Sequence, residues 1–366
     1  MSTSTDSFPI KGYDHIEFWV GNAKQAAHYY RHAFGFEFVA YAGPETGVRD
    51  RASYVLKQRG IRFVLMSALS PISEIAQHQA LHGDGVRTVA FQVPDAEEAF
   101  RLAVERGAAA HKAPVVIEDE HGKVVVGAVK AYGDTLHAFV QRDDYSGVYM
   151  PGFRTVDDDP IARPVGLSGI DHVVANVELG KMDYWAKWYA DVFGFTQFRH
   201  FSDEDISTEY TALMSKVIWD GKGRIKLPIN EPAEGKKKSQ IEEYLDHYRG
   251  PGVQHLALSS GNIVETVRDM RARGVKFLTV PDTYYVDARA RVGDIDEAWD
   301  ELQELGILVD RDDEGYLLQI FTEPVEDRPT LFYEVIQRHG ATGFGVGNFK
   351  ALFISIERAQ AERGNL

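Results

Sequence analysis

The sequence predicts an α+β fold built from four copies of one module, in which a strand and a helix precede about three further strands. The first observation is a motif, Gly-x-x-His or once Gly-x-x-Thr, that opens an apolar run at four places: Gly12-Tyr-Asp-His15, Gly85-Val-Arg-Thr88, Gly169-Ile-Asp-His172 and Gly252-Val-Gln-His255. The second observation is that each run is followed by an amphipathic helical pattern. Self-similarity of this kind indicates internal duplication, so the module is the unit of the fold.

The first module is expected to contain a strand, a helix and three strands, at residues 14–20, 23–34, 36–41, 52–56 and 61–67. The second contains a strand, a helix and two recognisable closing strands, at residues 86–93, 96–105, 124–132 and 135–141. The third and fourth modules open with strand–helix pairs, at residues 172–177 and 182–193 and at residues 255–258 and 263–273. These assignments rest on two-residue alternation in strands and a 3.6-residue apolar period in helices.

Two segments have no counterpart in the other modules. Residues 284–307 have a mostly helical pattern, and residues 348–363 form a helix with one apolar stripe that includes Phe349 and Phe353. The Gly-rich residues 343–349 are interpreted as a flexible hinge in front of a lid helix. A phosphate-binding loop is rejected because no Lys-Ser/Thr pair follows them.

The modules pair into two domains. The helices of modules one and three both end in Phe-Gly-Phe, whereas those of modules two and four end in Arg-Gly. Module three therefore repeats module one and module four repeats module two, so each domain consists of two consecutive modules. We expect an N-terminal domain at residues 1–150, a Pro- and Asp-rich linker at 151–166 and a C-terminal catalytic domain at 167–366.

The bulk composition excludes several classes of function. A net charge of −15 over 366 residues argues against a nucleic-acid partner or an anionic membrane surface, which require a basic face. The chain contains no Cys, which removes disulfides, thiolate metal sites and a Cys nucleophile. The first residues lack a charged-then-apolar signal pattern, and no apolar run reaches membrane-helix length, so we expect a cytoplasmic protein.

Glu334 is the residue that points most directly to chemistry. It lies in an otherwise apolar closing strand, where a lone carboxylate is costly to bury unless it is paired or binds a cation. His172 and His255 occupy equivalent positions in the first strands of modules three and four. Two imidazoles and one carboxylate form the facial triad typical of non-haem Fe(II), although zinc or manganese could use the same ligands. An ordinary ion pair of Glu334 is the alternative.

The N-terminal half is expected to lack this site. Its equivalents of the three ligands are His15, Thr88 and, when the closing strands are aligned on their shared Thr-Leu, Phe139. One possible ligand of three does not make a metal site, so His15 is interpreted as a structural residue.

Several polar residues interrupt or flank apolar strands in the C-terminal half: Ser215, Asn230, Gln254 and Gln319. On their own, such residues are as a rule structural hydrogen-bonding groups.

The chain resembles the vicinal-oxygen-chelate superfamily, whose βαβββ modules pair into open barrels, and within it the 4-hydroxyphenylpyruvate dioxygenase family. The resemblance covers essentially the whole chain and is dense from residue 167 onward. The stretches that carry it include Pro228-Ile-Asn-Glu-Pro232, Gly252-Val-Gln-His-Leu-Ala-Leu258, Tyr316-Leu-Leu-Gln-Ile-Phe-Thr322 and Gly343-Phe-Gly-Val-Gly-Asn-Phe349.

The resemblance implies Fe(II) bound by His172, His255 and Glu334. It further implies catalytic roles for Ser215, Asn230, Gln254 and Gln319, and a substrate site formed by Gln240, Phe321, Phe332, Phe344, Asn348 and Phe349. Phe321 and Phe349 are expected to sandwich the substrate ring.

The implied reaction converts 4-hydroxyphenylpyruvate and O2 to homogentisate and CO2, by oxidative decarboxylation, ring hydroxylation and side-chain migration in tyrosine catabolism. The N-terminal domain is then structural or oligomeric, without a metal, in a homodimer or homotetramer. The alternatives are a 4-hydroxymandelate synthase acting on the same substrate and a non-catalytic binding protein of the superfamily.

Overall fold

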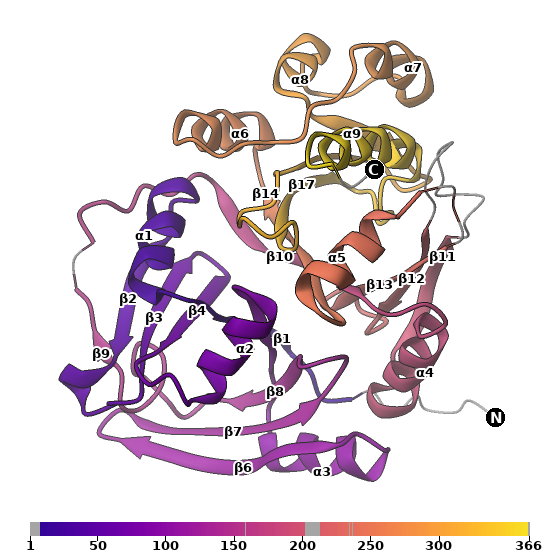
Figure 1. Ribbon diagram of the computed structural model, residues 1–366. Coiled ribbons are helices and arrows are strands. Elements are labelled where there is room, and N and C mark those ends of the chain that lie inside the picture. Colours follow the sequence, from indigo (N-terminus) through magenta and orange to yellow (C-terminus); the bar gives the residue numbers. More distant parts are fainter. Residues whose placement is uncertain (1–7, 158, 202–212, 234, 236, 365–366) are drawn as a thin grey trace.

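The computed structural model describes residues 8–157, 159–201, 213–233, 235 and 237–364. The first seven residues, on which part of the expectation of a missing signal sequence rests, lie outside this set. Figure 1 shows the chain as two halves, with the N-terminal half in indigo and magenta and the C-terminal half in rose, orange and yellow. Among the described residues, no helix combines the length and apolarity needed to span a bilayer.

The N-terminal half contains two modules of one strand, one helix and three strands, as predicted. The first comprises β1 (Gly12–Trp19), α1 (Ala23–Ala33), β2 (Glu37–Ala42), β3 (Arg51–Gln58) and β4 (Ile61–Ala68). The second comprises β5 (Gly85–Gln92), α3 (Ala96–Glu105), β6 (Ala110–Asp119), β7 (Gly122–Lys130) and β8 (Leu136–Gln141). Helix α2 (Glu74–His82) connects the modules, and a short 3-10 helix, η1 (Pro44–Thr46), precedes β3.

The C-terminal half repeats this plan with insertions. Its first module comprises β10 (Leu167–Asn176), α4 (Met182–Phe193), β11 (Thr196–Phe201), β12 (Leu213–Trp219) and β13 (Lys226–Pro232). Helix α5 (Gln240–Tyr248) connects it to β14 (Gly252–Ser260), α6 (Ile263–Ala272), β15 (Leu308–Arg311), β16 (Tyr316–Phe321) and β17 (Phe332–His339). The insertions are α7 (Thr283–Val292), α8 (Trp299–Leu305), η2 (Val346–Asn348) and the final helix α9 (Phe349–Glu362).

The two sheets have the same strand order once the modules are superposed. The first runs β6-β7-β8-β5-β1-β4-β3-β2-β9 and the second runs β11-β12-β13-β10-β14-β17-β16-β15. At the centre of each sheet, the first strands of two modules pair antiparallel, and each then pairs parallel with the last strand of its own module. Each sheet curls into an open barrel, so the predicted α+β fold of four paired modules is confirmed.

Three of the four module helices begin with the same cap. Asn22, Asp95 and Asn262 each accept a hydrogen bond from the backbone N–H three residues later, at 2.9–3.1 Å. This bond satisfies one of the backbone donors that every helix start leaves free, which fixes where the chain turns from strand to helix. The same cap therefore marks the start of the helix in each of these three modules.

Several elements were not predicted, each for a physical reason. Strand β6 is largely exposed and has no clean alternation, and the connecting helices α2 and α5 are short. The predicted linker is only partly a free connection, because β9 (Arg154–Thr155) pairs with β2. Asp159 in the same segment accepts hydrogen bonds from the Arg31 guanidinium and from Phe38 N at 2.8 Å. The linker therefore binds to the N-terminal half of the chain at β9 and at Asp159.

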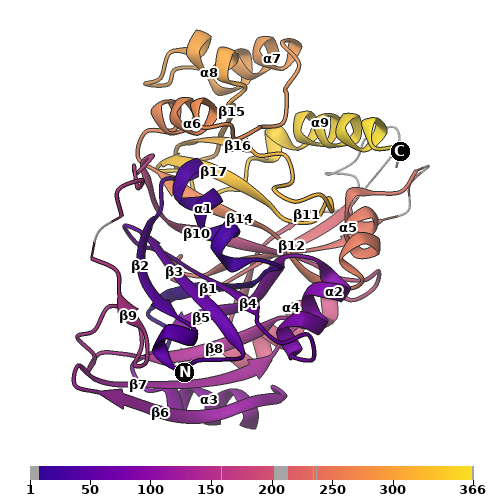
Figure 2. The same cartoon turned by 60° about the vertical axis from the view of Figure 1, so that its left-hand side comes forward.

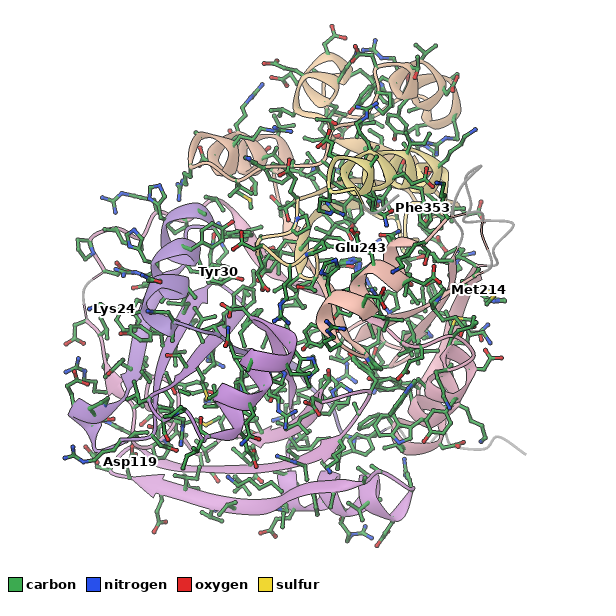
Figure 3. The ribbon with its side chains drawn as sticks, viewed as in Figure 1. Lys24, Tyr30, Asp119, Met214, Glu243 and Phe353 are labelled. Atoms are coloured by element: carbon green, nitrogen blue, oxygen red, sulfur yellow. The ribbon has the colours of Figure 1, made fainter. Side chains whose placement is uncertain are left out.

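The two halves share one continuous hydrophobic core, which includes Phe36 and Phe63 from the first half and Phe193 and Leu256 from the second. Polar contacts cross the same boundary. The Tyr333 hydroxyl donates to the Tyr30 hydroxyl at 2.7 Å, and Figure 3 shows Tyr30 on α1. The two halves are therefore packed against each other through apolar side chains and through this hydrogen bond.

Candidate metal centre

The three predicted ligands meet on neighbouring strands of the C-terminal sheet. His172 lies on β10, His255 on β14 and Glu334 on β17, three strands adjacent in the sheet order. One oxygen of Glu334, Oε2, lies 3.2 Å from Nε2 of His172 and 3.5 Å from Nε2 of His255. All three side chains are buried, and one donor atom from each falls within 4.8 Å of the others.

Two β-bulges create the setting of the histidines. The register between β10 and β14 shifts between Ile170 and His172, and again opposite the step from Val253 to His255. Asp171 and Gln254 are therefore the extra residues of two bulges, which turn their side chains out of the normal alternation. Each consequently lies beside the imidazole of the histidine that follows it.

These neighbours decide which nitrogen of each ring is available. Nδ1 of His172 donates to Oδ1 of Asp171 at 2.8 Å, and Nδ1 of His255 donates to Oε1 of Gln254 at 3.0 Å. Nε2 of each ring therefore faces Glu334, and in a neutral imidazole, which carries only one N–H, this nitrogen is free to bind a metal. Such outer partners orient metal-ligating histidines and raise their basicity. The sequence pointed to Gln254 through its position beside His255, but it did not single out Asp171.

Asp171 belongs to a buried charge cluster behind His172. Its carboxylate accepts two hydrogen bonds from Arg338, from Nε and Nη2, both at 2.8 Å, and Lys226 Nζ lies 3.4 Å away. Burial opposes ionisation of Asp171, but the hydrogen bonds from Arg338 and His172 outweigh it and hold the pKa of this carboxyl well below its usual range. The aspartate is therefore charged at every physiological pH.

The triad itself behaves as a carboxylate between two imidazoles. Burial would raise the pKa of Glu334, but the His172 charge and the hydrogen bonds from His172 and His255 lower it to about 2. Burial lowers the pKa of His255, whereas for His172 the effect of burial is exceeded by Glu334 and Asp171, which raise its pKa. Glu334 thus holds its negative charge in a buried site and requires a positive partner there.

The donor set fits a divalent transition metal. Two neutral imidazole nitrogens and one carboxylate oxygen on one side of an ion are the ligands of a facial triad, which leaves the other coordination positions open. The buried triad is therefore consistent with the metal site expected from the sequence, while the ligands alone do not distinguish iron from zinc.

The N-terminal half retains the supporting cluster but not the ligands. Asp14, again at a bulge, accepts hydrogen bonds from His15 Nδ1 at 2.6 Å and from the Arg142 guanidinium at 2.6 and 2.7 Å. Arg62 approaches the same carboxylate at 3.5 Å. Nε2 of His15 lies 3.3 Å from the Tyr149 hydroxyl, so a tyrosine occupies the position that Glu334 takes beside His172.

The predicted equivalence of Phe139 with Glu334 is wrong by one residue. In the parallel strand pairs, Ala90 is opposite Ala138, whereas the corresponding Ala257 is opposite Glu334. Phe139 instead points into the core between the halves, where its ring lies 6.1 Å from that of Phe193. A shift of one residue moves a strand side chain to the other face of the sheet. The conclusion survives, because Ala138 cannot bind a metal either.

Matching hydrogen bonds support the corrected alignment. Gln141 and Gln337 each accept a bond from the first backbone N–H of the module helix, from Ala96 at 3.1 Å and from Ile263 at 2.6 Å. Counting back three residues from each glutamine gives Ala138 and Glu334. The sequence alignment on Thr-Leu missed this because the turns before the two closing strands differ in length.

A cavity opens directly in front of the triad, on the concave side of the C-terminal sheet. It is lined by nearly all the residues predicted for the site: His172, Ser215, Asn230, Gln240, Gln254, His255, Gln319, Phe321, Phe332, Glu334, Phe344 and Phe349. The lining residues that were not assigned to the site are apolar: Val174, Phe201, Leu213, Val217, Pro228, Leu352, Phe353 and Ile356. Strand alternation around Ser215 and the apolar stripe of the last helix were the signals that could have identified most of them.

Asn348 is the one predicted residue that does not line this cavity. It is fully buried, and its Oδ1 accepts hydrogen bonds from the Tyr284 hydroxyl at 2.6 Å and from Arg291 at 3.4 Å. The side chain therefore joins the start of α9 to α7. Its contact with a substrate stays a prediction.

Aromatic rings surround the triad on the cavity side. The Phe332 ring stacks on His255 at 4.7 Å, and the Phe344 ring meets His172 edge-on at 5.0 Å. Among the polar lining groups, Oε1 of Gln319 is buried without a hydrogen-bond partner from the described residues. Nδ2 of Asn230 donates to Asn176 Oδ1 at 3.3 Å. The cavity is thus mainly apolar, with a few fixed polar groups, as expected of a small-molecule site.

Helix α9 covers the cavity. Figure 2 shows α9 above β11 and β12 and beside α5, and its residues Phe349, Leu352, Phe353 and Ile356 line the cavity. The helix is fixed at its middle and at its C-terminal end. The Ser355 hydroxyl donates to Thr279 O at 2.7 Å, and the Arg363 guanidinium pairs with Glu243 of α5 at 2.7 Å. Figure 3 shows Glu243 and Phe353 on these two neighbouring helices.

Comparison with known proteins agrees with this architecture. The profile described as "Hydroxyphenylpyruvate dioxygenase, HPPD, N-terminal" matches residues 5–154, and that of the "Glyoxalase/Bleomycin resistance protein/Dioxygenase superfamily" matches residues 169–320. The chain is 33% identical to a solved mutant of 4-hydroxymandelate synthase from Streptomyces coelicolor, with a TM-score of 0.86 over 96% of this chain and 99% of that one.

Similarity to proteins named 4-hydroxyphenylpyruvate dioxygenase extends over nearly the full length of the chain. The chain is 50% identical to the 4-hydroxyphenylpyruvate dioxygenase of Danio rerio, over 97% of this chain and 92% of the relative. It is 47% identical to that of Tetrahymena thermophila, over 97% of this chain and 91% of the relative. On the strength of these similarities and the module structure, the chain belongs to the 4-hydroxyphenylpyruvate dioxygenase family of the glyoxalase superfamily.

Proposed function

We propose that this chain converts 4-hydroxyphenylpyruvate and O2 to homogentisate and CO2, with Fe(II) bound by His172, His255 and Glu334. The observation that carries the proposal is the buried triad at the wall of an apolar, aromatic-lined cavity in a chain about half identical to 4-hydroxyphenylpyruvate dioxygenases along its whole length.

Iron suits this site because three protein ligands leave the remaining coordination positions of the ion open. A bound Fe(II) ion would leave coordination positions for a 2-oxo acid and for O2, which would confine the oxygen chemistry to the neighbourhood of the substrate. The protein's own contribution is to hold the three donors in place. Asp171 and Gln254 fix the two imidazole tautomers, and burial keeps water away from the reacting atoms.

The lining residues suit a phenylpyruvate. Phe321, Phe332, Phe344 and Phe349 offer aromatic surface to a phenol ring, while Ser215, Asn230, Gln240, Gln254 and Gln319 offer amide and hydroxyl groups to its polar ends. The unpartnered Oε1 of Gln319 is a ready acceptor for a phenolic hydroxyl, because an unsatisfied buried acceptor gains about 1–3 kcal/mol when it finds a donor.

The surrounding architecture supports further parts of the proposal. Residues 167–366 form the catalytic unit, and α9 acts as a lid that must move for substrate to enter. Residues 1–150 hold no metal at the triad-equivalent position and serve as a structural partner in a cytoplasmic homo-oligomer. The shared core between the halves is consistent with this structural role.

Product identification tests the reaction. The purified chain is supplied with Fe(II), O2 and 4-hydroxyphenylpyruvate, and the product is identified by mass and by chromatography against standards. Homogentisate is expected, whereas 4-hydroxymandelate would mean that oxygen goes to the benzylic carbon, as in the structural relative from Streptomyces. Oxygen uptake without either product, or no uptake, would contradict both assignments and leave a binding function.

The metal assignment has a separate test. Glu334→Ala should abolish turnover and iron retention, measured by elemental analysis after desalting, because the two imidazoles alone lack the negative charge that offsets the ion. An active, iron-loaded variant would refute the triad.

A further inference from the structure

A second cluster of metal-ligating side chains lies in the N-terminal half and uses none of the triad-equivalent positions. His78 and His82 are four residues apart on α2, so their rings share one face of the helix. Asp134, in the turn between β7 and β8, completes the group, and one donor atom from each residue lies within 4.8 Å of the others. Two histidines at this helical spacing, joined by a carboxylate, form a recurrent transition-metal motif.

Both ring nitrogens of His82 face oxygen acceptors, an arrangement that a bound cation would satisfy. Nδ1 of His82 faces the backbone carbonyl oxygen of Tyr248, and its Nε2 faces Oδ2 of Asp134 at 3.1 Å. Both partners can only accept, whereas a neutral imidazole has a single N–H. One ring nitrogen therefore turns a lone pair toward an oxygen. A proton or a metal ion between Nε2 and Asp134 removes this conflict.

His78 shows why a metal ion fits better than a proton. Its side chain is buried, and neither ring nitrogen has a hydrogen-bond partner among the described residues. An unsatisfied buried imidazole is destabilising. A metal ion bound to this ring would give one of its nitrogens a partner. The rings of His78 and His82 lie 4.5 Å apart, which places His78 beside the same gap.

The surrounding charges narrow the choice of ion. Arg87 stacks over Trp19 at 4.6 Å and donates to the backbone carbonyl of Asp134, so a fixed positive charge lies next to the cluster. Lys130 lines the same cavity. Asp134 is the only carboxylate among the three ligands, so the site offers few of the oxygen ligands that Ca²⁺ and Mg²⁺ prefer. Two imidazole nitrogens instead favour Zn²⁺ and its neighbours.

The cluster is also accessible. His78 and Asp134 line a cavity of about 400 Å³ whose wall includes Glu74, Gln77 and His111. The Asp134 side chain is half exposed, at 52%, so an ion can reach the site without unfolding of the surroundings. Water from the cavity can fill the remaining coordination positions.

We propose that His78, His82 and Asp134 bind one divalent ion of the zinc class, independently of the triad. The ion joins α2 to the turn between β7 and β8. Through the contact of His82 with Tyr248, it also fastens the end of α5 in the other half. The sequence-based expectation that this half holds no metal then applies only to the triad-equivalent position.

The test counts zinc ions per chain after chelator treatment, reloading with Zn²⁺ and desalting. The His172→Ala variant removes the triad site, so it should retain one ion and bind it with a measurable dissociation constant. Adding Asp134→Asn to His172→Ala should weaken that binding by at least about 10-fold. Because Asp134 is half exposed, the variant is expected to fold, which thermal unfolding of the metal-free proteins verifies.

A matched control uses another histidine pair of the same spacing. His28 and His32 are exposed on α1, with stacked rings 6.3 Å apart. His32→Ala in the His172→Ala background should leave the ion in place. The proposal is overturned if His172→Ala holds no zinc, if Asp134→Asn leaves the affinity unchanged, or if His32→Ala removes the ion.

Discussion

Replacing Asp171 by Asn tests two roles of this carboxylate: its contribution to the free energy of unfolding and its contribution to metal binding through His172. Asn keeps the volume of the side chain but removes the charge that faces Arg338, Lys226 and the His172 ring. Breaking a buried ion pair by neutralising one partner typically destabilises a protein by about 3–5 kcal/mol. Lys226, whose pKa burial already lowers despite Asp171, can lose its proton and relieve part of this loss. We therefore expect a loss toward the lower end of that range.

Metal binding should respond as well. Without the carboxylate, Nδ1 of His172 loses its charged acceptor, so the ring loses basicity and the preference for the tautomer with a free Nε2. Loss of such an outer partner typically weakens metal affinity about 10–100-fold. The assays are urea unfolding of the metal-free protein and the Fe(II) dissociation constant by competition with a chelator, followed by kcat/KM.

Asp14→Asn is the matched control. It removes the same carboxylate between a histidine and an arginine in the N-terminal half, away from the triad. We expect a comparable loss of stability with an unchanged Fe(II) dissociation constant. The reasoning would be refuted if Asp14→Asn weakened iron binding as much as Asp171→Asn, or if Asp171→Asn bound iron like the unmodified chain.

Three further predictions test other parts of the structure. His15→Ala should leave the iron content unchanged by elemental analysis; loss of iron would contradict the structural role of the Asp14 cluster. Phe349→Ala removes a cavity-lining ring that packs on Phe201 at 5.0 Å, so kcat/KM for 4-hydroxyphenylpyruvate should fall while iron still binds; unchanged kinetics would remove the proposed role of α9. His137 is buried between Val89 O and the Tyr189 hydroxyl, and burial lowers its pKa to about 4. Below an unfolded pKa of about 6.5 only the unfolded chain gains this proton, so stability should fall between pH 6.5 and 4, by roughly 3 kcal/mol in all. His137→Gln should flatten this part of the urea-unfolding profile, and an equally steep profile would contradict the burial effect.

The triad could be predicted from the sequence because duplication made it visible. His172 and His255 stand at equivalent positions of a repeat, and Glu334 interrupts an apolar strand. Most cavity residues followed from strand alternation and from the family resemblance. Such features can be recognised in the sequence because they depend on neighbouring residues or on repetition along the chain.

The parts that escaped prediction depend on register and tertiary packing. The bulges at Asp171 and Gln254 break the two-residue alternation, and nothing in a single sequence marks where a strand gains an extra residue. The alignment of Phe139 with Glu334 was wrong for the same reason. The turns before the two closing strands differ in length, and the sequence alone does not show where the gap between them belongs. The cluster of His78 with Asp134 joins elements 56 residues apart, counted from 78 to 134, so only the folded chain brings them together.

The continuous core has a consequence for how this protein can be divided. A cut between residues 151 and 166 would leave Phe139 and His137 of one fragment, and Phe193 and Tyr189 of the other, facing water in place of each other. Neither fragment would keep a closed interior, and aggregation would compete with folding. The two halves arose as copies in sequence, but as folding units they have become interdependent, so the half that carries the triad can be studied only with its partner attached or co-expressed.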